Sequence, residues 1–328
     1  MTPTAEHEPL EAAEVLTGPV VGLAGLAVRL TASDAPRAEA VAALFRNAER
    51  TAVHPRCGLA FTENDVDVPA TEPAAVIDDL ELWQPQPAHL HLRSSGGLTA
   101  RASPDEIVVG GDALSLSREF RFVCSVALTH LLAQHGRHVL HGGAVVADGR
   151  VLLVLGDTGT GKSTLVFSAL RLGWPALADD LVAVYQRDGT VYAVGLPRPI
   201  SVPADVFVDG IPGTRPVPED PRNRTELPGP MRTRGVHPIG AVVVTSRGSE
   251  PETAIEPIAG QDTLRIVLRA SVSLADPAVL PEVFAVAGTL ARLPAWSLRH
   301  GSEATSRLEA AARRLEEIGG LLGGRSWP

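Results

Sequence analysis

Cysteine and aromatic residues are scarce in this chain of 328 residues, of which aromatics make up 4%. The two cysteines, Cys57 and Cys124, lie far apart, and neither belongs to a Cys-x-x-Cys or Cys/His metal-binding pattern. We therefore expect both to be small buried hydrophobic residues and not redox or metal-binding groups.

Long hydrophobic runs and basic clusters are absent as well. No apolar run approaches the ~20 residues of a membrane-spanning helix. The first residues, MTPTAEHEPLEAAEVL, are acidic and lack the basic start of a secretion signal. The formal net charge is −9 without a polybasic run, which disfavours a nucleic-acid partner. We expect a cytoplasmic protein that binds neither nucleic acid nor membrane; whether it forms a homo-oligomer stays open.

Lysine occurs only once. Among the 29 Lys and Arg residues, every one except Lys162 is arginine, as expected for a GC-rich genome. A compact ammonium on a flexible stem reaches bound phosphates where a planar guanidinium does not fit. Lys162 therefore marks a position at which the chemistry requires lysine.

The first third of the chain predicts a small mixed α+β module over residues 1–115, suited to docking a substrate. Residues 51–88 are rich in Pro, Asp and Glu, and we expect them to be irregular. The expected elements are a strand over residues 20–30, a helix over 36–49 capped by Ser33 or Asp34, and a meander of strands over 89–93, 98–102 and 106–109.

The remainder, residues 116–328, alternates helical and strand patterns and predicts an α/β domain. Residues 209–237, full of Pro, Gly and Arg, are too long and polar for an ordinary connection and predict a mobile lid or a disordered insert. The expected helices are 117–134 (capped by Ser117), 165–172 and 303–318, and the expected strands are 139–147, 151–155, 182–186, 191–195 and 241–245. Asp148-Gly149 predicts a tight turn between the first two of these strands, and Arg187-Asp188-Gly189 predicts a paired hairpin of 182–186 with 191–195.

One motif in this domain carries specific chemistry. The segment RVLLVLGDTGTGKST contains G-x-x-x-x-G-K-[ST], with an apolar strand before it and an apolar helix after it. In such loops, backbone N–H groups surround the phosphates, the lysine reaches the β- and γ-phosphates, and the serine hydroxyl binds Mg²⁺. No guanine-selecting motif follows, so ATP is preferred over GTP; the alternative is a structural glycine turn. The expected nucleotide contacts are Gly156, Asp157, Thr158, Gly159, Thr160, Gly161, Lys162, Ser163 and Thr164.

An acidic pair and a histidine complete the candidate site. Asp179 and Asp180 follow the loop in ALADDL, where one carboxylate could bind Mg²⁺ and the other could act as general base. His141, in VLHGGAVV, could hold the base carboxylate by a hydrogen bond. The alternatives are a solvated turn for the aspartates and a structural role for the histidine.

The segments HGGAVV, GDTGTGKS and LADD, in this order and spacing over about residues 138–200, resemble the HPr kinase/phosphorylase family. They also resemble its relatives found beside genes for ribosomally made peptides. The resemblance implies a nucleotide-domain fold of phosphoenolpyruvate carboxykinase type. It also implies that Asp179 is the base that activates a serine hydroxyl and that His141 steers it. Asp180 would be a second carboxylate on the metal side, beside Ser163.

Thr164 stands where that family typically has glutamate, and the family's later Gly/Arg-rich signature is not recognisable. These differences favour kinase activity over the reverse phosphorolysis. Among the arginines Arg198, Arg215, Arg222, Arg224, Arg232 and Arg234, Arg198 lies between two prolines. It is our first choice for neutralising charge on the γ-phosphate in the transition state; the alternative for each is a solvated loop residue.

The sequence therefore predicts an ATP- and Mg²⁺-dependent kinase that acts on a serine hydroxyl of a peptide or small protein. One alternative is a small-molecule kinase for a sugar or other metabolite hydroxyl. The other is a non-catalytic, nucleotide-responsive binding module.

Overall fold

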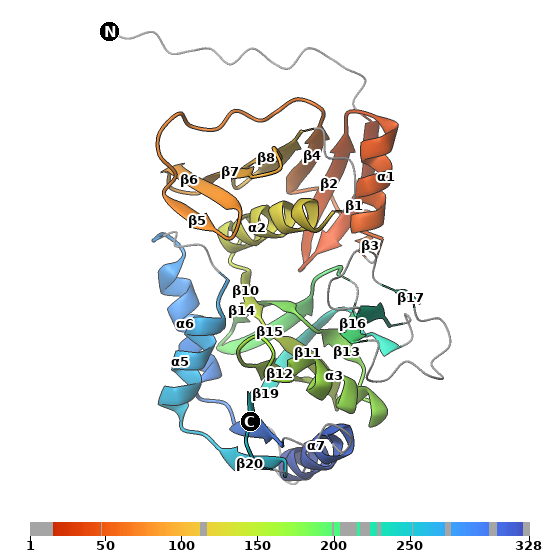
Figure 1. Ribbon diagram of the computed structural model, residues 1–328, viewed down its shortest axis with the longest axis vertical. Helices are drawn as coiled ribbons and strands as arrows, with labels where there is room; N and C mark the ends of the chain where they lie inside the picture. The colour runs from red at the N-terminus through yellow and green to blue at the C-terminus, as the bar shows by residue number, and fades with distance from the viewer. Residues whose placement is uncertain are drawn as a thin grey trace. The chain divides into compact units, whose positions relative to one another are not determined.

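The computed structural model describes residues 16–46, 48–111, 117–198, 200–203, 215–216, 224–227, 231–250, 252–272, 277–301 and 307–323. These residues form a mixed α/β structure with two large mixed sheets and six helices (Figure 1). The chain divides into two compact units, one of residues 1–22, 26–85 and 89–127, the other of 23–25, 86–88 and 128–328. Residues 117–127 thus cluster with the first unit, and the predicted boundary at 115/116 stays a prediction. The predicted mobile segment, 209–237, lies mostly outside the described residues.

The N-terminal unit is built on a nine-stranded sheet of order β3-β1-β2-β4-β9-β8-β7-β6-β5. Helix α1 (Ala35–Leu44) packs on β2 and β4, and the Asp34 side chain caps it by accepting from the Arg37 backbone N–H at 2.9 Å, as predicted. The strands are β1 (Leu16–Leu23), β2 (Leu26–Ala32), β3 (Glu49–Arg50), β4 (Cys57–Thr62), β5 (Ala75–Ile77), β6 (Leu80–Gln86), β7 (His89–Ser94), β8 (Thr99–Ala102) and β9 (Glu106–Gly110).

The meander predicted from alternating residues is confirmed as β7, β8 and β9. The helix expected over 36–49 ends earlier, at Leu44, because β3 begins at Glu49, and two other predictions for this unit are wrong. The single strand expected over 20–30 is broken by a turn at Ala24 and Gly25, whose φ angles of 49° and 80° are those of a tight hairpin turn. Residues 51–88 are not irregular, because they contain β4, β5 and β6. Strand β4 pairs in parallel with both β2 and β9, which are distant in sequence.

The C-terminal unit places helices on both faces of the second sheet (Figure 1), whose main path is β10-β14-β15-β19-β12-β11-β13. Helices α3 and α7 share one hydrophobic core with the sheet, and α5 and α6 share the other. The helices of this unit are α3 (Lys162–Arg171), α5 (Gly260–Ala270), α6 (Leu280–Leu290) and α7 (Arg307–Gly323). Helix α2 (Arg118–Gln134) belongs to both units, because its residues 118–127 cluster with the first. The strands are β10 (His138–His141), β11 (Gly143–Ala147), β12 (Arg150–Leu155), β13 (Ala176–Ala178), β14 (Leu181–Arg187), β15 (Thr190–Gly195), β16 (Ser201–Pro203), β17 (Arg215–Pro216), β18 (Arg224–Glu226), β19 (Val236–Arg247), β20 (Ala254–Pro257) and β21 (Ala295–His300).

The predicted helices and hairpins near the glycine-rich motif are confirmed. Asp148-Gly149 joins β11 to β12, and Asp188-Gly189 joins β14 to β15, all four residues having positive φ. The strand expected over 139–147 is instead two strands that separate at Gly142. Strand β10 pairs with β14, whereas β11 pairs with β12 and β13. A Cβ atom on Gly142 would lie 2.7 Å from the Val154 carbonyl oxygen, so only glycine fits this close approach.

Both cysteines are free and buried, as predicted. Burial raises the pKa of the Cys57 thiol to about 11 and also raises the pKa of Cys124. Both thiols are therefore protonated near neutral pH and poorly nucleophilic. Among the described helices, none is both long and apolar enough to cross a membrane.

A buried histidine predicts how the stability of the protein depends on pH. His138 is 2% exposed, with Nε2 3.4 Å from the Glu282 carboxylate. Burial lowers its pKa below 6.5, against an opposing effect of Glu282. Below about pH 6.5 the unfolded chain therefore binds a proton that the folded chain does not. As the pH is lowered, the free energy of unfolding decreases, until the pH reaches the lower pKa that His138 has in the folded protein. We expect His138→Gln to reduce this loss between pH 7 and 5 in urea unfolding, by at most about 1.4 kcal/mol per pH unit. Equal pH slopes in the two proteins would contradict the prediction.

Candidate functional site

Several strands of the second sheet end at the same edge. Strands β12, β19 and β21 run parallel, so their carboxyl ends meet there. Strand β13 is antiparallel to β11, which is itself antiparallel to β12, so β13 also ends at this edge. In open α/β sheets, ligands bind outside the carboxyl ends of the strands. The predicted site residues follow two of these strands: the motif follows β12, and Asp179 and Asp180 follow β13.

The glycine-rich loop, residues 156–161, connects β12 directly to α3. Gly156, Gly159 and Gly161 have φ angles of 141°, 81° and 104°, in the region that favours glycine. Gly161 is the N-cap of α3, so Ser163 and Thr164 lie in the first turn of the helix. The first backbone N–H groups of a helix have no partner within the helix and carry its positive dipole end. The loop therefore leads into a terminus that favours an anion.

The side chain of Lys162 turns back onto this loop. Its ammonium donates to the carbonyl oxygens of Gly156, at 2.8 Å, and Asp157, at 3.0 Å. Lys162 is only 7% exposed, although residues 157–159 beside it are exposed. The one ammonium in the chain's side chains is thus held at the loop where the motif predicts phosphates.

A pair of threonine hydroxyls fastens the loop to β19. Thr160 Oγ1 donates to the Asp157 carbonyl oxygen at 2.7 Å and lies 2.9 Å from Thr245 Oγ1. Thr245, which is 2% exposed, also lies 3.2 Å from the Leu155 carbonyl oxygen. Each hydroxyl has one proton to donate. Because Thr160 donates to the Asp157 carbonyl oxygen, the Thr245 hydroxyl is the donor to either Thr160 Oγ1 or the Leu155 carbonyl oxygen, or shares its proton between them in a bifurcated bond. The loop is held in shape by its neighbouring strand.

Three residues at this edge were not predicted from the sequence: Thr245, Arg247 and His300. The ring of His300, at the end of β21, packs so closely on Gly161 that a Cβ atom there would lie 2.5 Å from it. Arg247 donates from Nε to the Gly159 carbonyl oxygen at 2.6 Å. These contacts join residues far apart in sequence, so no local pattern identifies them.

Two loop glycines provide a matched test of this packing. A Cβ atom on Gly156 would lie 2.5 Å from the Thr245 carbonyl oxygen, whereas Gly159 has nothing within 4 Å of that position. We expect Gly156→Ala to destabilise the protein by about 1–3 kcal/mol, through overpacking added to backbone strain. Gly159→Ala should cost only about 1 kcal/mol, because the strain of a positive φ remains without the clash. Thermal unfolding of both variants measures the difference, and an equal cost would contradict the packing argument.

The two aspartates occupy different surroundings. Asp179 is 7% exposed, and its Oδ2 accepts from the Ser201 backbone N–H at 2.9 Å. Ser201 belongs to β16, which packs against α3, so Asp179 lies on the α3 side of the sheet. Asp180 is about four-tenths exposed and faces two other predicted site residues.

Asp180 is the carboxylate on which His141 and Arg198 meet. Its Oδ1 lies 3.5 Å from His141 Nδ1, and its Oδ2 accepts from Arg198 Nη1 at 3.0 Å. The Arg198 carbonyl oxygen in turn accepts from Arg232 Nη2 at 2.6 Å. His141 was predicted to hold Asp179, but in the structure its contact is with Asp180. Because these side chains are more than a third exposed, water screens the ion pairs and each stabilises the fold little.

The residues predicted to bind the metal ion offer it oxygen donors only. Among the described residues, no group of three or more His, Cys, Asp and Glu side chains could hold a metal. Mg²⁺ usually takes one or two protein oxygens and completes its shell with phosphates and water. The Ser163 hydroxyl and the two aspartate carboxylates are oxygen donors of this kind.

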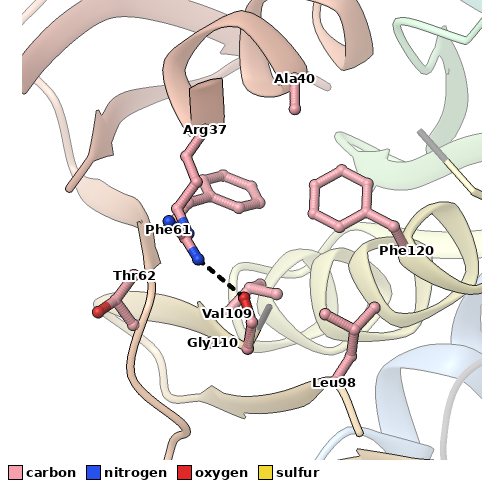
Figure 2. A pocket seen from close by; sticks show the side chains of 9 residues that line it. Arg37, Ala40, Phe61, Thr62, Leu98, Val109, Gly110 and Phe120 are labelled. Atoms are coloured by element: carbon pink, nitrogen blue, oxygen red, sulfur yellow. Dashed lines mark hydrogen bonds between the residues drawn. The ribbon is translucent and has the colours of Figure 1, made fainter. Parts of the chain in front are cut away.

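The N-terminal unit contains a separate cavity (Figure 2), where the Arg37 guanidinium is buried and donates to the Gly111 carbonyl oxygen at 3.0 Å. The same guanidinium pairs with Asp34, so its charge is neutralised. The lining residues are Arg37, Ala40, Phe61, Thr62, Leu98, Val109, Gly110, Gly111 and Phe120. Among the described residues that line it, none is a nucleophile with an adjacent base.

Comparisons with known proteins do not show which family the chain belongs to. No protein-family model and no curated protein matches it. Among solved structures, the HPr(Ser) kinase/phosphatase from Coxiella burnetii is similar with a TM-score of 0.28 and 11% sequence identity. The match covers 56% of this chain and 98% of that one. A similarity at this level assigns neither family nor activity.

Proposed function

We propose that this protein is an ATP- and Mg²⁺-dependent phosphotransferase of the cytoplasm. Its acceptor would be a serine hydroxyl of a peptide or small protein. The observation that carries the proposal is the position of the glycine-rich loop and Lys162 at the same sheet edge as Asp179 and Asp180. Phosphoryl transfer needs a phosphate cradle and a proton acceptor close together, and this edge supplies both kinds of group.

In this proposal the loop and α3 hold the phosphates. Backbone N–H groups of residues 156–164 would donate to phosphate oxygens, and Lys162 would exchange its bonds to Gly156 and Asp157 for the β- and γ-phosphates. The Ser163 hydroxyl and a nearby carboxylate would hold Mg²⁺, which neutralises phosphate charge when bound. Arg198 would move from Asp180 toward the γ-phosphate as negative charge shifts during transfer.

One of the two aspartates would accept the proton of the acceptor hydroxyl. The acceptor oxygen attacks the γ-phosphorus, its proton passes to a carboxylate, and the bond from the γ-phosphorus to the bridging oxygen breaks as ADP leaves with the electron pair. We propose Asp179 as this base, Asp180 as the metal-side carboxylate and His141 as the group that steers the pair. The alternative is that Asp180 is the base and Asp179 the metal-side carboxylate. The contacts of His141 and Arg198 with Asp180 support this alternative.

The proposal is tested by incubating the protein with γ-labelled ATP, Mg²⁺ and a cell extract. We expect label in a polypeptide, in an acid-stable bond to serine. Label found only in small metabolites would favour a small-molecule kinase. ATP binding without transfer to any component would favour a non-catalytic, nucleotide-responsive module.

A further inference from the structure

Arg247 ends β19 next to the glycine-rich loop and uses little of its hydrogen-bonding capacity. Its Nε donates to the Gly159 carbonyl oxygen at 2.6 Å, which fixes the guanidinium at the rim of the loop. Over the described part of the chain, its two terminal nitrogens have no hydrogen-bond or ion-pair partner. The side chain is exposed, so these nitrogens can reach a ligand on the loop. A guanidinium anchored in this way is prepared to bind an anion with its free edge.

The order of the strands indicates which part of the nucleotide Arg247 meets. Across the sheet edge, β11 and then β13 lie on one side of β12, and β19 lies on the other. Asp179 and Asp180 follow β13, so the proposed acceptor approaches the loop from that side. In an in-line transfer the leaving group departs on the side of the phosphorus opposite the acceptor. The ADP part of the nucleotide therefore extends toward β19 and Arg247.

We propose that Arg247 binds the α-phosphate, at the nucleoside end of the triphosphate. This inference rests on the proposed function, because it takes the direction of the nucleotide from the position of the aspartates. Lys162 and the loop already serve the β- and γ-phosphates, which leaves the α-phosphate as the anion without a cation. The two free terminal nitrogens of Arg247 match two phosphate oxygens.

The α-phosphate is common to ATP, ADP and AMP, and this gives the test. We expect Arg247→Gln to weaken the binding of all three nucleotides by a similar factor, about tenfold or more, measured by displacement of a fluorescent nucleotide. Arg247→Lys keeps the charge but cannot form the two-pronged contact, and should give a smaller loss that is again equal for the three. The control is Arg299→Gln, which removes one positive charge from the neighbouring strand β21, where Arg299 lies 3.7 Å from Glu256. It should change nucleotide affinity less than about twofold.

Several results would overturn the inference. A loss confined to ATP would place Arg247 at the γ-phosphate, and unchanged affinities would remove it from the binding site. A purely structural role, holding Gly159 in place, predicts a lower melting temperature of the nucleotide-free variant, with Arg247→Lys binding as the native protein does. If Arg247→Gln does not fold, unequal losses in Arg247→Lys count against the inference in the same way. If the native protein binds neither ATP nor ADP, the proposed function itself fails. If the native protein transfers phosphate and Arg247→Gln binds all three nucleotides as tightly as the native protein does, only this inference fails.

Discussion

Replacing Lys162 by alanine should abolish ATP binding at micromolar nucleotide and remove phosphoryl transfer. The ammonium is the cation at the start of α3 and is already held at the loop by Gly156 and Asp157. Charge-assisted hydrogen bonds contribute about 1.5–3 kcal/mol each, so the loss of two of them weakens binding on the order of 100-fold or more. Calorimetric titration with ATP measures the affinity, and the release of labelled phosphate measures turnover.

A matched control lies at the other end of the same helix. Arg171→Ala removes the positive charge of an exposed residue in the last turn of α3, away from the loop, and should bind ATP as the native protein does. Lys162→Arg separates charge from shape, because the planar guanidinium keeps the charge but does not fit a compact site. If Lys162→Ala still binds and turns over ATP, the glycine-rich loop is a structural turn and the proposed function is wrong.

Replacing Asp179 by asparagine should leave ATP binding intact while reducing transfer by a factor of about 10²–10⁴, the usual contribution of a general base. Asparagine keeps the shape of the side chain and can still accept from the Ser201 backbone N–H, so the fold around β16 should survive. The Kd for ATP and the rate constant of a single turnover separate binding from chemistry. A variant that binds and transfers normally would exclude Asp179 as the base.

Asp180→Asn makes the comparison within the pair. If Asp180 is the metal-side carboxylate, its loss should raise the Mg²⁺ concentration needed for half-maximal activity more than it lowers the rate at saturating Mg²⁺. If instead Asp180→Asn lowers the rate and Asp179→Asn raises the Mg²⁺ requirement, Asp180 is the base and Asp179 the metal-side carboxylate. The contacts of His141 and Arg198 with Asp180 support this alternative. Asp188→Asn, in the exposed turn between β14 and β15, is a control that makes the same chemical change without touching the site.

The parts of the fold that local chemistry determines could be predicted from the sequence. Asp148-Gly149 and Asp188-Gly189 take positive φ readily, so both hairpins were predicted at the correct turns. Strand β4 could not be predicted in this way, because it is specified by parallel partners about 30 and 50 residues away, β2 and β9. The break at Gly142 was missed for a similar reason. The two halves divide there because β10 pairs with β14, about 40 residues further along the chain, whereas β11 pairs with β12.

In the candidate site, too, the residues of a local motif could be predicted, and those brought in by strand pairing could not. The loop from Gly156 to Lys162 is a continuous motif, so its residues could be named from the sequence and its strand and helix confirmed. The hydroxyl of Thr245 and the guanidinium of Arg247 contact the loop across 85 and 88 positions of sequence. Neither belongs to a recognisable pattern, and only the parallel pairing of β12 with β19 brings them there. The sequence therefore indicates which loop to examine, and the sheet determines what surrounds it.

Because Lys162 is the only lysine of the chain, a lysine-specific endopeptidase has one peptide bond to cut, the bond between the first two residues of α3. That bond lies in the first turn of a helix whose leading side chain is buried, so digestion must wait for this turn to unwind. The digestion rate thus reports the opening of one turn without any label. A ligand bound at the loop should slow this cleavage. The cleavage rate therefore measures how much of the unmodified protein has ligand bound at the loop.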